Sequence, residues 1–300
     1  MTRLLALKVD VDTLRGTVEG VPRLIRALQQ AQARATFLFS MGPDNTGRAL
    51  RRVFRKGFLS KVSRTSVIEH YGLRTLSYGV LQPGPDIGVR AVAPMRATQA
   101  AGFECGIHAW DHVKWHDQVR TASDEWTVRE WSLASVRFAE VFGTSAKVCG
   151  AAGWQINEAT VRLQDNGGIQ YASDGRGPRP YRITIANHPV GPVQYPSTLP
   201  TLDEVVGRDG VTVANAHEHL LAQTRSSPAD SLQVFTLHAE LEGGKWLPIF
   251  ERLLAGWRTQ GYELVDLAQV HEHWRSREIV VQPLQWGSVP GRAGELVVSN

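Results

Sequence analysis

The sequence predicts an α/β protein in which parallel strands are wrapped by helices. Apolar runs of strand length alternate along the chain with longer segments whose apolar residues recur at helical spacing. This alternation is typical of parallel strands joined by crossover helices, arranged either as a barrel or as an open sheet. The chain has 300 residues, 42% of them hydrophobic, which is enough for one large domain with a sizeable core.

The expected elements follow one another in about seven strand–helix steps with no linker between them. The expected strands are LLALKVDV (4–11), RATFLFS (34–40), FECGIH (103–108), AKVCGAA (146–152), IQYAS (169–173), LQVFTLH (232–238) and YELVDL (262–267). The expected helices cover residues 20–32, 86–101, 123–143, 157–167, 213–224 and 246–261. Pro22 stands near the start of the first helix, where a proline is tolerated, and Ser123 opens the longest one.

Two segments fall outside this alternation. Residues 44–85 interrupt it between the second and third strands, and the tail beyond Trp274 has apolar stretches with no helical partner. We therefore expect one domain over residues 1–274 with an insertion at 44–85, followed by a tail at 275–300 to which the sequence assigns no function.

The composition excludes several classes of protein. Cys105 and Cys149 lie in apolar runs and cannot form a disulfide framework, which fits reduced, buried thiols in the cytoplasm. The opening MTRLLALKVDVDT contains two aspartates and no small-residue cleavage site, so we expect no signal peptide. No window approaches the roughly 20 apolar residues that span a bilayer. The formal charge of +4 is too small to indicate nucleic acid as a partner.

The insertion is rich in basic residues. Between Arg48 and Arg64 it has seven basic residues and no acidic ones, and apolar side chains recur among them at near-helical spacing. Such a segment suits an anionic membrane surface. The candidate membrane-binding residues are Arg51, Arg52, Phe54, Arg55 and Phe58. The alternative is a solvated helix whose apolar side packs on the domain, and composition alone favours neither.

Ionisable residues stand at the ends of four expected strands. Asp10 and Asp12 come at the end of the first, and His108 ends the third. Asp174 follows IQYAS, and His238 ends LQVFTLH. Because active-site residues of parallel α/β folds gather where strands end, we expect these side chains to share one site.

The aspartate pair and the histidines of GIHAWDH indicate a metal. Asp10 and Asp12 point to the same face of a strand, where two carboxylates repel each other unless a cation lies between them. His108 and His112, four residues apart, can converge on one ion if the segment is helical or turned. The sequence thus predicts a two-histidine, one-carboxylate site for a divalent metal ion. Each pattern alone is common by chance, and the structural alternative is a polar loop.

These motifs resemble those of the polysaccharide deacetylase family, metal-dependent enzymes that hydrolyse N-acyl or O-acyl groups of sugars on a distorted seven-stranded (β/α) barrel. The chain has VDVDT, HAWDH and TLHAE where the family has an aspartate pair, His-x-x-x-His and a late Leu-x-His. It is most similar to one branch, the 4-deoxy-4-formamido-L-arabinose-phosphoundecaprenol deformylases. This resemblance covers residues 3–268, in the strings DVDTLRGTVEGVPRL, FSMGPDNTGR, GIHAWDH, AAGW, SDGRG, LPTLDEVVGRD and HAELEG.

The resemblance implies a role for each residue of the expected site. Asp12, His108 and His112 would bind the divalent metal, and zinc, manganese and cobalt all tolerate these ligands. Asp10 would be the general base that activates water. His238 would be the general acid that protonates the leaving amine, because an amide anion is a very poor leaving group.

Other positions have less defined roles. Asp174 would orient or tune one of these groups. Many family members have an arginine in the third motif that pairs with the catalytic aspartate, whereas this chain has CGAAGWQ; Arg176 of SDGRG is a candidate substitute. Trp110 and Trp154 are candidates to stack on a sugar ring, although core tryptophans are equally common. His116 is a less favoured third imidazole ligand.

The resemblance also implies the reaction and the partners. The expected activity is hydrolysis of the formamide of 4-deoxy-4-formamido-L-arabinosyl undecaprenyl phosphate. It gives formate and an amino sugar that is later used to mask lipid A phosphates against cationic peptides such as polymyxin. Because this substrate lies in the bilayer, we expect residues 44–85 to attach the protein peripherally to the cytoplasmic face of the inner membrane.

Three alternative functions differ in class. The nearest is an N-deacetylase of another sugar or of peptidoglycan on the same fold. A ferrous oxygenase would also use two histidines and one carboxylate, but such enzymes usually have double-stranded β folds. A non-catalytic sugar-lipid binding module would not need the acid and base that the chain supplies.

Overall fold

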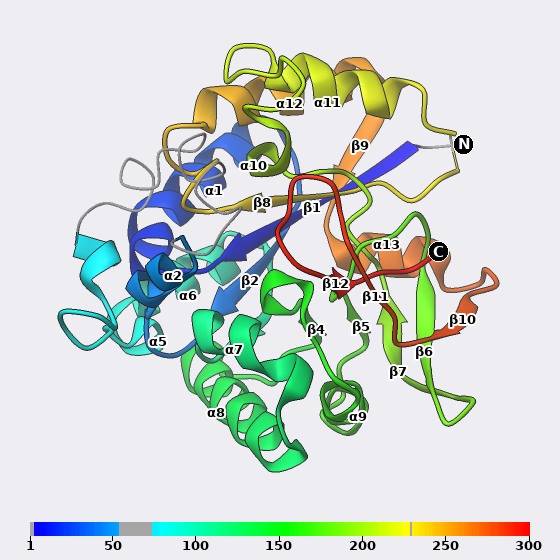
Figure 1. Cartoon of the computed structure of the whole chain (residues 1–300). Coiled ribbons are helices and arrows are strands. Elements are labelled where there is room, and N and C mark those ends of the chain that lie inside the picture. The colour runs from blue at the N-terminus through cyan, green and yellow to red at the C-terminus, as the bar shows by residue number, and fades with distance from the viewer. Residues whose placement is uncertain (1–2, 54–73, 229) are drawn as a thin grey trace.

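The strands form one large, mostly parallel sheet, with helices packed around it (Figure 1). The structure is a computed structural model that describes residues 3–53, 74–228 and 230–300. The strands of the main sheet are β1 (Arg3–Val11), β2 (Thr36–Ser40), β3 (Glu104–Ala109), β4 (Val148–Cys149), β5 (Tyr171–Ala172), β6 (Tyr181–Ile185), β7 (His188–Gln194), β8 (Val234–His238), β9 (Tyr262–Val265) and β10 (Val280–Pro283). A second, two-stranded sheet pairs β11 (Trp286–Gly287) with β12 (Leu296–Val297).

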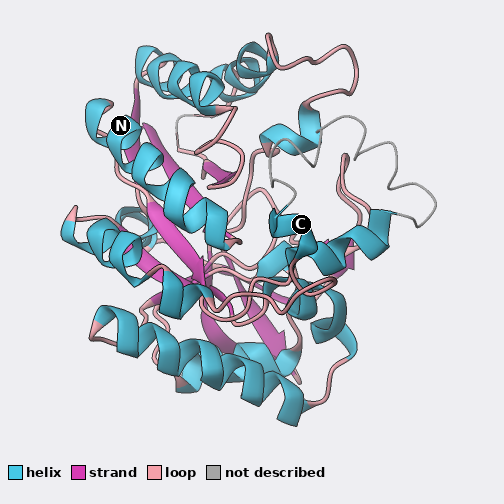
Figure 2. Ribbon diagram, turned by 90° about the vertical axis from the view of Figure 1, so that its left-hand side faces the viewer, coloured by secondary structure: helices cyan, strands magenta, loops and turns pink. Residues whose placement is uncertain are grey.

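Helices follow most of the parallel strands, and Figure 2 shows them around the strands at the centre of the molecule. The α-helices are α1 (Val21–Gln30), α2 (Thr46–Val53), α5 (Ile87–Arg90), α6 (Val92–Ala100), α7 (His112–Gln118), α8 (Asp124–Phe142), α9 (Glu158–Asn166), α10 (Leu202–Val205), α11 (Ala216–Arg225), α12 (Leu247–Thr259) and α13 (Leu267–Trp274). Among the helices described, none is both long and apolar enough to cross a bilayer.

Local sequence explains where several helices begin and end. The Ser123 side chain accepts a hydrogen bond from the backbone N–H of Trp126 and so caps α8, and Gly143 ends this helix with φ of 73°. The single helix expected over residues 86–101 is instead divided at Ala91 into α5 and α6. Pro94 accounts for the break, because its ring clashes with the carbonyl four residues earlier and it has no N–H to donate.

The closed seven-stranded barrel predicted from the sequence is not confirmed. The order along the sheet is β10-β6-β7-β5-β4-β3-β2-β1-β8, with β9 also paired to β1, and no ladder among the described residues joins β10 to β8 or β9. The sequence analysis missed the antiparallel hairpin of β6 and β7, which turns through Ala186 and Asn187 at positive φ. Because β7 pairs with β5 and β6 with β10, this hairpin extends the sheet outward.

The register of β1 brings two of the expected site residues together. β1 is buried over most of its length and pairs with β2, β8 and β9. In the ladder with β8, Asp10 stands opposite His238. Both residues lie at the carboxyl ends of their strands, at the edge of the sheet where the loops after β3 and β4 also meet.

The tail after α13 packs against the rest of the molecule rather than extending from it (Figure 1). β10 adds to the sheet beside β6, and the Gln155 side chain donates a hydrogen bond to the Glu295 carbonyl at 2.7 Å. Arg292 pairs with the buried carboxylate of Glu204 at the end of the molecule where the strand-end loops lie. The tail therefore contributes a charged side chain to the surroundings of the expected site.

The insertion is described only in part. Arg51 and Arg52 belong to α2, whereas Phe54, Arg55 and Phe58 lie outside the described residues.

A half-buried acidic residue lies at the opposite edge of the sheet, at the amino end of β3. Glu104 accepts hydrogen bonds from the hydroxyls of Thr36 and Tyr171, which begin β2 and β5. Burial raises the pKa of Glu104 to about 7, even though both hydroxyls lower it. The folded protein therefore holds a proton here at a pH where the unfolded chain has released it.

We predict that this proton makes stability depend on pH. As pH rises from about 4.5 to about 7, the unfolded chain loses the Glu104 proton before the folded protein does, so the free energy of unfolding should fall by up to about 3 kcal/mol. Chemical denaturation across this range should show a flatter dependence in Glu104→Gln. Glu263→Gln, which changes an exposed glutamate of β9, is the control and should retain the wild-type slope.

Candidate metal and active site

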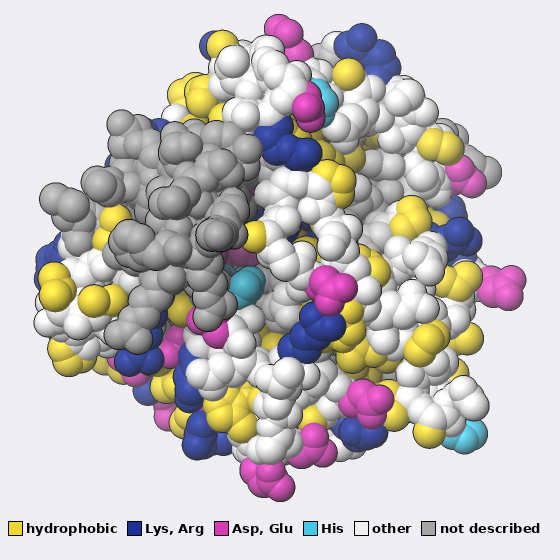
Figure 3. All heavy atoms as spheres, viewed as in Figure 1, with side chains coloured by type: hydrophobic (Ala, Val, Ile, Leu, Met, Phe, Trp, Pro, Cys, Tyr) yellow, Lys and Arg dark blue, Asp and Glu magenta, His cyan; other side chains and the backbone are white. Residues whose placement is uncertain are grey.

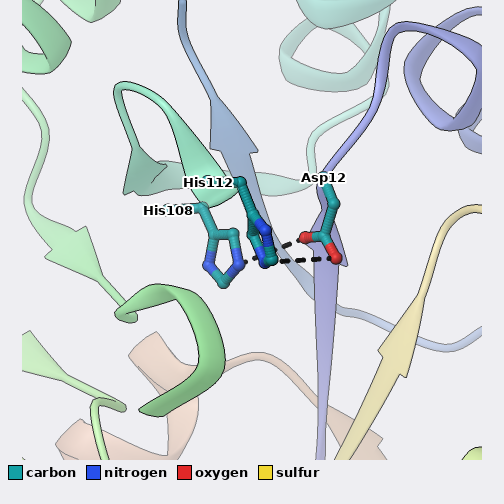
Figure 4. Close-up of side chains that lie close together, drawn as sticks. All are labelled: Asp12, His108 and His112. Carbon is teal, nitrogen blue, oxygen red and sulfur yellow. Dashed lines mark ion pairs between the residues drawn. The ribbon is translucent and has the colours of Figure 1, made fainter. Parts of the chain in front are cut away.

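Asp12, His108 and His112 converge at the carboxyl end of the sheet (Figure 4). Asp12 directly follows β1, His108 lies near the end of β3 and His112 begins α7. One ligand atom from each residue lies within 4.8 Å of the others. His108 Nε2 is 3.2 Å from Asp12 Oδ1, and His112 Nε2 is 3.4 Å from Asp12 Oδ2.

Asp111 explains why histidines four residues apart meet although a strand ends between them. Its carboxylate accepts hydrogen bonds from the backbone N–H of Lys114 at 3.0 Å and from the Asn45 side chain at 2.6 Å. As the N-cap of α7 it starts a helix three residues after His108. The two imidazole rings are therefore brought to a centroid distance of 5.3 Å with 28° between their planes.

A backbone carbonyl fixes the tautomer of His108. Its Nδ1 lies 2.6 Å from the Gly150 carbonyl oxygen, which can only accept, so Nδ1 bears the hydrogen. Nε2 is then the nitrogen directed toward Asp12, which is the orientation of a histidine that binds a metal through Nε2.

Asp174 holds the loop on which this carbonyl lies. It is fully buried, and its carboxylate accepts hydrogen bonds from the Ala151 N–H at 2.8 Å and from the side chains of Gln164 and Gln194 at 2.7 and 3.0 Å. Burial raises the pKa of Asp174, while these donors lower it. Asp174 thus reaches His108 only indirectly, through Ala151 and the neighbouring carbonyl.

The charges of the cluster suit a cation. Burial raises the pKa of Asp12, but His112 and His108 outweigh burial and lower it well below its usual range. Burial lowers the pKa of His108, but Asp10 and Asp12 outweigh burial and raise it. Asp12 Oδ1 is buried without a hydrogen-bond partner. Two imidazole nitrogens and a carboxylate that lie this close together fit the ligand set of a divalent metal ion.

Asp10 and His238 lie beside this cluster on neighbouring strands. Asp10 Oδ2 is 3.3 Å from Lys8 Nζ, whereas Asp10 Oδ1 is buried and has no hydrogen-bond partner. His238 Nδ1 is likewise buried without a hydrogen-bond partner. The expected base, the expected acid and the three expected metal ligands therefore lie together at one end of the sheet. Lys8 was not anticipated.

Two buried glutamates of the HAELEG segment hold this group in place, and the sequence analysis missed them. One oxygen of Glu240 accepts hydrogen bonds from the backbone of Asp12 at 3.0 Å and from the N–H and hydroxyl of Thr13, both at 2.7 Å. Glu242 accepts one from the His238 N–H at 2.7 Å. Burial and the charge of Asp12 raise the pKa of Glu240 to about 8. The signal in the sequence was two acidic residues alternating with apolar ones directly after a buried strand.

The two tryptophans predicted to bind sugar differ in their surroundings. Trp110 is partly buried and lines, with His108, a small cavity beneath the site. Trp154 is only 2% exposed, and its ring is surrounded by the cationic groups of Lys8, Arg176 and Arg292 at 5.1, 5.0 and 4.2 Å. This ring has no open face on which a sugar could stack.

The Arg176 side chain makes hydrogen bonds and an ion pair within the protein. It is 7% exposed, bonds to the Ser197 and Leu199 carbonyls and pairs with Glu204 at 2.7 Å. The cation that contacts Asp10 is Lys8, so Arg176 does not substitute for an arginine of the third motif in this structure. His116 pairs with Asp117 at 3.6 Å and is not one of the three clustered ligands.

On the face shown in Figure 3, basic and acidic side chains of the described residues are interspersed, and a histidine is visible near the centre.

Comparisons with known proteins identify relatives over most of the chain. No family model matches the chain. A protein of Shewanella sediminis (strain HAW-EB3), named a probable 4-deoxy-4-formamido-L-arabinose-phosphoundecaprenol deformylase ArnD, is 34% identical over 267 residues, which cover 89% of this chain and 85% of that protein. A protein of Wigglesworthia glossinidia brevipalpis with the same name is 30% identical, covering 93% of this chain and 96% of that protein.

Solved structures show the fold independently. A protein from Mycobacterium smegmatis described as a polysaccharide deacetylase matches with a TM-score of 0.65 over 96% of both chains, at 17% identity. Identity of 34% over most of both sequences is sufficient to assign a family. The chain therefore belongs to the 4-deoxy-4-formamido-L-arabinose-phosphoundecaprenol deformylases, which share the polysaccharide deacetylase fold.

Proposed function

We propose that this protein is a metal-dependent deformylase acting on a lipid-linked amino sugar. Its reaction is hydrolysis of the formamide of 4-deoxy-4-formamido-L-arabinosyl undecaprenyl phosphate, giving formate and 4-amino-4-deoxy-L-arabinosyl undecaprenyl phosphate. The product serves the modification of lipid A and resistance to polymyxin. The observation that carries the proposal is the meeting of Asp12, His108 and His112 beside Asp10 and His238, in a chain related throughout its length to proteins named for this reaction.

The metal site is built from residues whose orientation the fold already fixes. Asp12, His108 and His112 would hold zinc, manganese or cobalt, and bound there the ion would act as a Lewis acid on the formyl carbonyl and make water acidic near neutral pH. Gly150 directs the Nε2 lone pair of His108 into the site, and Glu240 fixes the backbone from which Asp12 projects.

Asp10 and His238 divide the proton transfers. Asp10 Oδ1, buried and without a partner, takes a proton from the attacking water. As the C–N bond of the formamide breaks, His238 gives a proton to the sugar nitrogen, which leaves as a neutral amine. The two residues are paired in the β1–β8 ladder, so the proton acceptor for water and the proton donor for the leaving nitrogen lie next to each other.

The first prediction is that formate release depends on both the metal and Asp10. Purified protein should release formate from the formamido-arabinosyl lipid in detergent, and chelation should abolish this release. Asp10→Asn should lower kcat by a factor of about 100 to 10,000, because the variant cannot accept the proton of water.

Asp165→Asn, at an exposed position of α9, is the matched control and should retain full activity. Acetate from an N-acetylated glycan, without formate from the lipid, would reject the deformylase proposal in favour of a deacetylase.

The second prediction concerns Glu240. Glu240→Ala removes the acceptor shared by Asp12 and Thr13, so the affinity for Mn²⁺ should fall by about 10- to 100-fold in calorimetric titrations. Glu240→Gln keeps one oxygen for these hydrogen bonds and should bind nearly as the wild type does. Equal affinity in the alanine variant would show that Asp12 needs no support from this side chain.

We further propose that residues 44–85 attach the protein to the cytoplasmic face of the inner membrane. The support is the composition of this segment and the lipid named in the relatives' activity. Near an anionic surface each basic residue contributes on the order of 1 kcal/mol.

The third prediction is therefore that the wild type sediments with vesicles containing anionic lipid but not with purely zwitterionic ones. Changing Arg51, Arg52 and Arg55 together to Gln should weaken binding by about 100-fold, from roughly 3 kcal/mol. A control triple variant at the exposed Arg129, Arg162 and Arg275 should bind as the wild type. Unchanged binding after loss of the three insertion arginines would contradict the proposal.

A further inference from the structure

Lys8 is a charged side chain completely buried in the middle of β1. Its exposed fraction is 0%, and it stands in an otherwise apolar stretch of the central strand. An ammonium group is costly to bury, and a buried ion pair is often no more stabilising than apolar residues of the same size. Stability alone therefore does not account for a lysine at this position.

The contacts of Lys8 show what its charge does. Its Nζ lies 3.3 Å from Asp10 Oδ2 and donates a hydrogen bond to the Ser173 carbonyl at 3.2 Å. The Trp154 ring lies 5.1 Å from the same nitrogen. The ammonium is thus fixed by a carbonyl and an indole while it holds one oxygen of the carboxylate. The other oxygen, Asp10 Oδ1, has no hydrogen-bond partner, and His108 Nδ1 lies 3.9 Å from it.

The end of β4 leaves room for this side chain. Gly150 follows β4, and a Cβ atom added to it would lie 3.2 Å from Lys8 Cε and 2.5 Å from Leu38 Cδ1. A larger residue here would press on the lysine stem. The small residues of CGAAGW are therefore matched to a long cationic side chain that reaches across from β1.

We propose that Lys8 is a positioning residue that fixes the carboxylate of Asp10, so that Oδ1 alone is turned toward the reacting water. Lys8, Asp10 and Asp12 alternate along β1 and so share one face of the strand. The lysine neutralises and orients the first carboxylate from within the protein, and the second is left for the metal. The proposal rests on the proposed function, because it takes Asp10 to be the base.

The test is a double-mutant cycle in the full chain with Mn²⁺ supplied. Lys8→Met should lower kcat for formate release by about 100-fold, as expected when a catalytic group is misplaced, while KM and the affinity for Mn²⁺ stay near wild type. Lys8→Arg retains a cation and should recover most of kcat. In the Asp10→Asn background, Lys8→Met should have no further effect on kcat.

The control for Lys8→Met is a substitution in another ion pair that contains a buried aspartate. Arg34 pairs with the buried Asp266 at 2.7 Å, and Asp266 caps α13. Arg34→Met should reduce stability without changing kcat. Full kcat in Lys8→Met, or an equal loss from it in the Asp10→Asn background, would overturn the proposal.

Unfolding measurements test the contact between Lys8 and Asp10 without any substrate, so their outcome does not depend on the proposed reaction. Urea denaturation of the same four proteins should show coupling, with Lys8→Met costing less stability when Asp10 is already Asn, because no buried carboxylate then loses its cation. Additive effects would overturn the proposal. If the wild type released no formate, the proposed function would fail, and this coupling would still decide whether Lys8 holds Asp10.

Discussion

The rest of the site depends on the burial of two carboxylates, Asp10 and Asp12, two residues apart on one strand. Two neighbouring carboxylates repel each other, so positive groups beside them are favourable. The fold supplies Lys8 to the first, and His108 and His112 to the second. The groups that lie beside these two carboxylates therefore come from β1 itself, from β3 and from α7.

A second set of buried groups acts on the backbone rather than on the substrate. Glu240, Glu242 and Asp174 each accept N–H groups from the loops at strand ends, where no ladder is left to pair them. Through these hydrogen bonds they fix Asp12, His238 and the loop whose carbonyl orients His108. These hydrogen bonds restrict the movement of the strand ends, which a site for a metal and two proton transfers requires.

The sequence predicted the parts of the site that follow from periodicity. The two aspartates and the two histidines could be placed in one site because apolar runs marked the strand ends and the histidines are four residues apart. The choice of Asp12 as the ligand came from the family resemblance. Lys8 escaped notice because one lysine in an apolar run does not reveal whether it is buried. The β6–β7 hairpin was missed because Pro189 and Gly191 obscure its strand pattern, and without it the open sheet could not be told from a barrel. The burial of Trp154 depends on three cations from distant segments, which no local pattern encodes.

Two chemically identical side chains thus acquire different tasks from the kind of cation beside them. Lys8 is covalently part of the chain, so the charge beside Asp10 cannot leave, and the carboxylate is free to exchange only a proton. Asp12 instead faces the imidazoles of His108 and His112, which can bind a metal in their neutral form, so an ion from solution can complete its surroundings. A permanent cation makes one aspartate suitable as a base, and an exchangeable one makes the other a ligand. The alternation of a lysine and two aspartates in KVDVD is enough to encode this division, provided that the strand is buried on the face they share.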